Sequence, residues 1–145
     1  MTLDDYRRYV AAFNARDYAA LHAFFTDDVV LEAGGMALRG KDAISRFYDF
    51  FHAHARETVT IKAFFEGQGE FRDQSVANVI IRFLGLKDLT PELLAKHGSV
   101  KMNPVPKGVV VDVEFLIVYY LRKGLVHHIR CGVVDPVDPT IQPTG

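Results

Sequence analysis

The residues best suited to acid–base chemistry lie in the last third of the chain, on two predicted strands. Asp112 and Glu114 stand two positions apart, so both carboxyl groups leave the same face of a strand. Enclosure in an apolar cavity raises the pKa of a carboxyl group, which suits proton transfer near neutrality. His127 and His128 are adjacent, and neighbours on a regular strand point to opposite faces. One imidazole could therefore act inside as a general base, but the two cannot converge on one metal ion.

The sequence shows no other motif of enzyme chemistry. The remaining histidines lack His-Glu-x-x-His or similar spacing, and the single cysteine, Cys131, excludes a disulfide framework and a cysteine-rich metal site. Cys131 itself is expected to be a small buried hydrophobic residue and not a nucleophile. Gly67-Gln68-Gly69 lacks the βαβ surroundings of a dinucleotide-binding fingerprint. We therefore predict chemistry without a metal or an organic cofactor.

Composition and charge exclude several classes of partner. The 145 residues are 49% hydrophobic and 24% charged, which is typical of one packed domain spanning 1–145. Lysine and arginine total 17 and aspartate and glutamate 18, so the formal net charge of −1 offers no footprint for nucleic acid or an anionic membrane. The chain shows no signal-peptide layout and no apolar stretch long enough to cross a bilayer. We expect a cytoplasmic protein.

Helical patterns come first along the chain and strand patterns follow. Apolar residues recur at helical spacing over 3–15 and 40–55, and Asp17 can cap a short helix between them. A short strand is expected at 29–33. Alternating residues then predict four longer strands, the last two joined by a tight turn at 122–124. These strands cover 58–63, 75–86, 108–121 and 125–134. This order is typical of an α+β fold in which helices pack on one face of a curled antiparallel sheet.

Two segments stand apart from this pattern. Residues 87–107 interrupt the strands with an insert that contains a predicted helical turn at 90–96, and inserts of this length often form lids or interface arms. The tail, 135–145, is broken by prolines and is expected to be extended.

Three stretches of the first half resemble the nuclear transport factor 2-like superfamily, and within it the ketosteroid isomerases and the SnoaL-like polyketide cyclases. Two of them are residues 9–17 and 24–29. The third is the segment in which Gly40, Ile44, Phe47 and Tyr48 recur at their characteristic spacing. The resemblance covers 6–86 and 108–134. It implies a cone-shaped curled antiparallel sheet closed by three N-terminal helices (a cystatin-like α+β roll), a pocket for a small apolar ligand, and pairing of two copies as a homodimer.

The resemblance also implies roles for particular residues. Tyr9 matches the tyrosine that donates a hydrogen bond to the developing enolate in the isomerases, and Tyr48 matches a tyrosine that supports it. Tyr9 can alternatively be a core tyrosine whose hydroxyl binds the backbone. The family's two catalytic acids would fall at Ala33 and near Leu116, so neither is kept. A base must then come from elsewhere in the pocket.

The same resemblance sets which residues of the last two strands would face into the cone. Those expected inside are Asp112, Glu114, Leu116, Val118, His127, Ile129 and Cys131. Those expected outside are Val113, Phe115, Ile117, Tyr119, His128 and Arg130. The apolar outward row predicts a dimer surface. Alternatively, the two acids lie at a solvated rim and His127 is a hydrogen-bonded core or interface residue. Glu32, beside Ala33, is expected to face away from the pocket.

Two hypotheses on function follow. The first is a cofactor-free enzyme, a dehydratase in preference to an isomerase or cyclase, acting on a hydrophobic, oxygenated ring compound. Tyr9, supported by Tyr48, would polarise a substrate oxygen, and His127, Asp112 or Glu114 would move the proton. The alternative is a non-catalytic ligand-binding or dimerisation domain of the same fold. Convergence of Tyr9, His127 and an acid on one enclosed volume would favour the enzyme.

Overall fold

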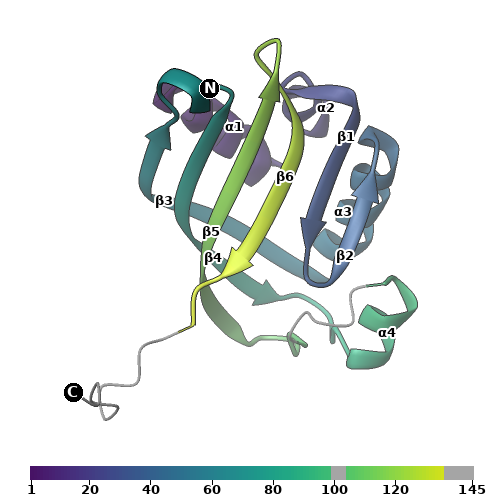
Figure 1. Ribbon diagram of the computed structural model, residues 1–145. Coiled ribbons are helices and arrows are strands. Elements are labelled where there is room, and N and C mark those ends of the chain that lie inside the picture. The colour runs from purple at the N-terminus through teal and green to yellow at the C-terminus, as the bar shows by residue number, and fades with distance from the viewer. Residues whose placement is uncertain (99–103, 136–145) are drawn as a thin grey trace, which may run out of the picture.

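The computed structural model of the protein describes residues 1–98 and 104–135 (Figure 1). The helices are α1 (Leu3–Ala15), α2 (Tyr18–His22), α3 (Lys41–His54) and α4 (Pro91–Lys96), with one 3-10 turn, η1 (Gly69–Phe71). The strands are β1 (Phe25–Ala33), β2 (Met36–Arg39), β3 (Ala55–Glu66), β4 (Gln74–Gly85), β5 (Val110–Arg122) and β6 (Leu125–Val133). The predicted α+β fold is confirmed. The predicted tail lies, beyond Asp135, outside the described residues.

Six strands form one curled sheet in the order β2-β1-β6-β5-β4-β3. Every neighbouring pair is antiparallel except β1 and β6, which run parallel. Figure 1 shows α1, α2 and α3 on one side of this sheet, where their apolar faces cover it. Strand β1 starts at Phe25, earlier than the expected strand at 29–33, and β2 was not predicted from the sequence. The three N-terminal helices therefore close the concave face, as the resemblance implied.

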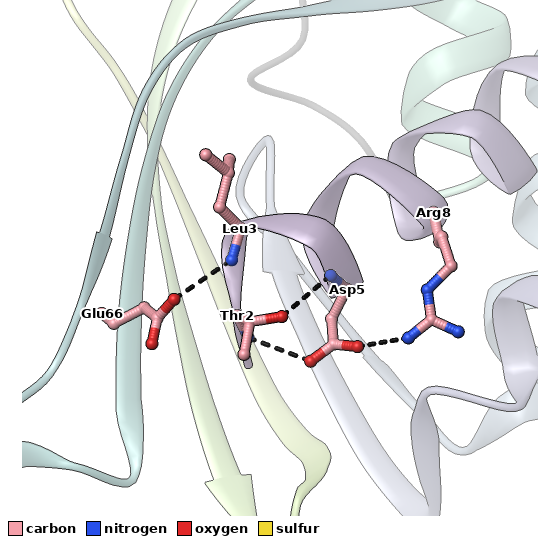
Figure 2. Close-up of polar contacts among 5 residues, drawn as sticks. All are labelled: Thr2, Leu3, Asp5, Arg8 and Glu66. Atoms are coloured by element: carbon pink, nitrogen blue, oxygen red, sulfur yellow. Dashed lines mark hydrogen bonds and ion pairs between the residues drawn. The ribbon is translucent and has the colours of Figure 1, made fainter.

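Helix α1 is fixed at its start by the capping box drawn in Figure 2. The Thr2 hydroxyl accepts a hydrogen bond from the Asp5 backbone N–H at 3.1 Å, and the Asp5 carboxylate accepts one from the Thr2 N–H at 3.0 Å. Asp5 also pairs with Arg8. The Leu3 N–H donates to Glu66 at the end of β3, at 3.1 Å. These contacts hold α1, with the tyrosines it carries, against β3.

The side chains of β5 face opposite to the direction expected from the resemblance. Val113, Phe115, Ile117 and Tyr119 pack on the concave side with the core. Asp112 and Glu114 lie on the outer side, where they pair with polar residues of β4 and β3. The physical reason is burial: this phase encloses an unbroken apolar row, whereas the expected phase would have buried two carboxylates. The predicted dimer surface is therefore wrong, because the row from Val113 to Tyr119 that was expected to form it faces inward.

A bulge in β6 overturns the expected position of His127. Leu121 pairs with Val126 and Tyr120 with His128, which leaves His127 as an extra residue in β6. Two-against-one pairing breaks the simple alternation of faces. His127 and His128 consequently border the same surface hollow, together with Arg39. His127 does not line the cone, while Ile129 and Cys131 do, as predicted.

The insert packs against one end of the cone. Its helix, α4, occupies the predicted helical turn, and Leu89 forms an isolated bridge with Val105. Leu89 and Leu94 are each 1% exposed, so the insert is tied to the core by apolar contacts. At its base, Gly85 has no room for a side chain, since an added Cβ would lie 1.9 Å from the Pro106 carbonyl oxygen. Residues 99–103 of the insert lie outside the described residues.

Candidate functional site

The concave side of the sheet holds a cavity of about 180 Å³. All six strands contribute to its wall, along with α1, α3 and the insert residues Pro104 and Val105. The described lining residues are mainly aliphatic and aromatic, with a few polar side chains among them. Such a wall favours an apolar ligand that is oriented by a small number of hydrogen bonds.

Three tyrosine rings meet at the cavity wall. Tyr6 and Tyr9 stand one helical turn apart on α1, and Tyr119 reaches them from β5. The hydroxyl oxygens of Tyr6 and Tyr119 are 3.1 Å apart, and the Tyr9 ring centroid lies 5.6 Å from that of Tyr119. Burial raises the pKa of Tyr6 to about 12 and holds the pKa values of Tyr9 and Tyr119 well above the ordinary value for tyrosine. Their hydroxyls therefore stay protonated and can donate hydrogen bonds at neutral pH.

Tyr48 lines the same cavity from α3. Its ring packs edge-on against Phe13, with centroids 5.3 Å apart, and is stacked on His52 at 5.0 Å. Burial raises the pKa of Tyr48 well above its ordinary value, and the negative charge of Glu57 adds to the effect. Both tyrosines singled out in the sequence thus lie in the cavity wall, while their catalytic roles stay predictions.

An acid that sequence reasoning did not select also lines the cavity. Glu57, near the start of β3, has a side chain only 8% exposed and binds the His52 imidazole, whose Nε2 lies 2.7 Å from Glu57 Oε2. The other ring nitrogen, Nδ1, lies 2.6 Å from the hydroxyl of Tyr18 on α2. His52 is 4% exposed, so this Tyr18–His52–Glu57 chain runs from the half-buried Tyr18 through the interior to the cavity.

The carboxylates expected in the cone have partners on the outer face instead. Asp112 forms two hydrogen bonds with Arg82, of 2.8 and 2.9 Å. Glu114 accepts hydrogen bonds from Lys62 and Asn78, both at 2.8 Å. These hydrogen bonds lower the pKa of both carboxyl groups, which favours the charged form. The expectation that Asp112 and Glu114 act inside the pocket is therefore wrong.

Glu32 faces away from the cavity, as predicted. It accepts hydrogen bonds from His128 on β6 at 2.8 Å and from Arg130 at 2.9 Å. The hydrogen bond from His128 is the main cause of a lowered pKa at Glu32. Its neighbour Ala33, at the position of the family's general base, does line the cavity but carries no titratable group.

The remaining predicted features concern Cys131, metal ions and membranes. Burial, with a smaller contribution from Glu57, raises the pKa of Cys131 to about 12, so its thiol stays protonated and a poor nucleophile. Among the residues that the structure describes, no cluster of three or more histidine, cysteine, aspartate or glutamate side chains is arranged to hold a metal. No described helix is long and apolar enough to cross a membrane.

Comparisons with known proteins place the chain in a family. Residues 6–128 match the SnoaL-like domain family, and the chain belongs to it. No curated protein matches the chain.

Solved structures show the same fold. The chain is 20% identical to a candidate polyketide cyclase of Pseudomonas putida KT2440, with 87% of this chain and 86% of that chain covered and a TM-score of 0.69. A Mycobacterium tuberculosis protein in complex with estradiol-17beta-hemisuccinate is also 20% identical, with coverage of 89% and 90% and a TM-score of 0.65. A computationally designed 17-OHP binder is 20% identical over 87% of each chain, with a TM-score of 0.63.

Proposed function

We propose that the protein binds a small, apolar, oxygen-bearing ring compound in the cone and acts on it by cofactor-free acid–base chemistry. The observation that carries this proposal is an apolar cavity whose wall holds neutral tyrosine hydroxyls. The chemistry would be isomerisation, dehydration or cyclisation, reactions that move protons without a change of oxidation state. Membership of the SnoaL-like family supports this range of reactions.

The size of the cavity favours a ligand of one or two rings. Its volume of about 180 Å³ is close to that of an engineered cavity of about 150 Å³ that holds benzene. The estradiol derivative of the M. tuberculosis neighbour supports a ring compound as the ligand class. A four-ring skeleton would require this cavity to widen, so we propose a smaller relative of such compounds as the substrate.

Tyr9 is the proposed hydrogen-bond donor to the ligand. A reaction that removes a proton next to a carbonyl builds negative charge on the carbonyl oxygen, and a fixed donor in an apolar site stabilises that charge. Tyr9 is fully protonated at neutral pH because burial raises its pKa. Tyr48, whose pKa is also raised by burial, is proposed to support the ligand from α3.

The second candidate function is ligand binding without chemistry. It is favoured by the absence of an acid at the two positions that match the family's catalytic carboxylates, Ala33 and Leu116. Ala33 lines the cavity without a titratable group, and Leu116 is 47% exposed on the outer face. Both candidates predict a ligand in the cone, and only the enzyme predicts turnover that depends on Tyr9.

The test is a binding and turnover screen with a panel of one- and two-ring ketones, alcohols and phenols, read by NMR. We expect saturable binding of at least one compound and turnover that falls tenfold or more in Tyr9→Phe with binding retained. Tyr120→Phe deletes the same hydroxyl from a strand residue that borders an outer-face hollow and serves as the control. Turnover unaffected by Tyr9→Phe would favour binding alone or another donor. If no compound of the panel binds, the proposed function is wrong.

We also propose that two copies pair through the outer face of the sheet as a homodimer. The support is a shallow hollow on that face bordered by Leu116, which is 47% exposed, and by Val118. Solution mass by light scattering tests this proposal, and Leu116→Lys should convert the dimer to a monomer. A wild-type monomer at micromolar concentration would contradict it.

A further inference from the structure

The Tyr18–His52–Glu57 chain supplies a proton acceptor that the cavity otherwise lacks. We propose that Glu57 is the catalytic base of the pocket, and that His52 and Tyr18 are positioning residues that hold it. The substrate class would then be a ring ketone with a hydrogen on the carbon next to the carbonyl. This inference rests on the proposed function, because it needs a ligand in the cone.

Glu57 is placed to touch a ligand, whereas its two partners are not. Among the described residues that line the cavity, Glu57 is the only one with a carboxylate or an ammonium-type charge. His52 and Tyr18 do not line it and stand behind Glu57, on α3 and α2. Only Oε2 of Glu57 binds His52, and Oε1 makes no hydrogen bond to any residue that the structure describes. That second oxygen is available to accept a proton.

The hydrogen bonds are satisfied in both charge states of His52. A carboxylate can only accept, so Nε2 of His52 carries the hydrogen that faces Glu57. In the neutral ring Nδ1 is then an acceptor, and the Tyr18 hydroxyl donates to it. If His52 gains a proton, Nδ1 donates and the Tyr18 oxygen accepts instead. The chain therefore holds Glu57 in place without leaving a buried nitrogen unpaired in either state.

The junction between helix α3 and strand β3 brings His52 and Glu57 together. The helix ends at His54 and the strand begins at Ala55, so His52 and Glu57 are only five residues apart on either side of this junction. The ring of His52 packs against two aromatic rings, with its centroid 5.0 Å from that of Tyr48 and 6.0 Å from that of Tyr18, and the two tyrosine rings lie 6.3 Å from each other. These ring contacts and the hydrogen bonds at both nitrogens hold the imidazole in one orientation, which positions the carboxylate it binds.

The negative charge of Glu57 acts on the rest of the pocket. It contributes to the raised pKa values of Tyr48 and Cys131, both of which line the cavity with it. The titratable groups that face the carboxylate are thus His52, Tyr18, Tyr48 and Cys131, and no lysine or arginine is among the described lining residues. No lysine or arginine in the described part of the cavity wall therefore competes with a bound ligand for the carboxylate.

The proposed proton transfer to Glu57 requires no oxidant or reductant. Glu57 removes a proton from the carbon next to the carbonyl, and the electrons of that C–H bond form a carbon–carbon double bond. The carbonyl π electrons move to oxygen, where the tyrosine hydroxyls donate to the enolate. Return of the proton from Glu57 to the same carbon gives exchange with solvent protons if the carboxylic acid exchanges first. In a ring ketone that also carries a carbon–carbon double bond conjugated with the enolate, return of the proton to the far carbon of the resulting dienolate gives an isomer.

Deuterium exchange tests the inference directly. The probe is 2-tetralone or, if another ketone of the panel binds more tightly, that ketone, and NMR in D₂O follows loss of the signal from hydrogens next to the carbonyl. We expect the wild-type protein to accelerate exchange, and Glu57→Gln to lower kcat about 100-fold with affinity changed less than about threefold. Glu70→Gln makes the same change at an exposed residue outside the cavity and should exchange like the wild type.

Two further variants keep the inference open to refutation if Glu57→Gln does not fold. Glu57→Asp draws the carboxylate back by one methylene and should lower kcat about tenfold. Tyr18 lies outside the cavity, and Tyr18→Phe should lower kcat a few-fold with KM unchanged. A merely structural role of Tyr18 would not change kcat alone. A wild-type protein that binds the ketone without accelerating exchange, or Glu57→Gln exchanging at the wild-type rate, overturns the inference. Failure of every panel compound to bind instead contradicts the proposed function.

Discussion

Each face of the sheet holds a carboxylate that is paired with a side chain from a neighbouring element, and the two pairs differ in burial. On the outer face, Asp112 pairs with Arg82, and the two side chains are 45% and 62% exposed. On the concave face, Glu57 pairs with His52, and the two side chains are 8% and 4% exposed. Water screens the first pair, so it contributes little to stability. The second pair is costly to bury, and its place beside the cavity supports the proposed role of Glu57 in ligand chemistry.

The largest effect on stability should come from breaking the buried pair. His52→Ala leaves Glu57 as an unpaired buried carboxylate and should lower the free energy of unfolding by about 3 kcal/mol. Replacing both residues by leucine should cost less than the two single changes together, because no charge is then left alone. Urea denaturation measures each value. Additive costs in the double variant would show that the two groups do not act as a pair.

A smaller loss is expected where the insert meets β4. Gly85→Ala would place a methyl group 1.9 Å from the Pro106 carbonyl oxygen, so the insert must shift, at a cost of about 2 kcal/mol. Gly132→Ala, on β6, has 3.7 Å to its nearest atom and is the matched control. Because Pro104 and Val105 line the cavity, Gly85→Ala should also weaken ligand binding. Equal stability of the two variants would contradict this tight approach.

The concave face should govern the response of the protein to alkali. Tyr6 and Cys131 keep their protons in the folded chain up to about pH 12, whereas the unfolded chain releases them near the ordinary pKa values of 10.0 and 9.0. Their stabilising contribution is therefore present below about pH 9 and is lost as the pH rises toward 12. Thermal midpoints should fall over this range, and less steeply in Tyr6→Phe. Identical slopes for Tyr6→Phe and the wild type would contradict the prediction.

The smallest effects are expected from the outer face. The pKa values of Asp112 and Glu114 are lowered by hydrogen bonds to their partners, so any stabilisation is present above the ordinary values and lost as the pH falls through the folded ones. Exposure makes that contribution slight. Asp112→Asn and Glu114→Gln should leave the thermal midpoint at pH 7 within experimental scatter. A fall in thermal midpoint as large as that of His52→Ala would contradict the prediction that pairs on the outer face contribute less to stability than the buried pair.

Much of the fold was accessible from the sequence. Apolar spacing identified α1 and α3, and alternation identified the long strands, because both patterns follow from which side chains must be buried. The prediction of which β5 side chains face the cavity was wrong because it was taken from the resemblance. The unbroken apolar row of Val113, Phe115, Ile117 and Tyr119 indicates the observed side by itself.

The candidate site was less accessible. Alternation backward from Val59 places Glu57 on the same face, and His52 stands one helical turn after Tyr48, so both signals existed in the sequence. That the two side chains meet depends on the turn between α3 and β3, which spacing alone does not specify. The bulge that removes His127 from the cone likewise depends on pairing with β5 and has no signature in the local sequence.

The central claim is that the ligand site lies on the concave face of the sheet. Methyl-labelled protein titrated with 2-tetralone, or with the tightest-binding ring compound of the panel, tests it in one NMR experiment. We predict shifts at Ile81, Ile117 and Ile129, which line the cavity, and none at Leu116 and Val118 on the outer face. Shifts at Leu116 and Val118 with the three isoleucines unchanged would contradict the account.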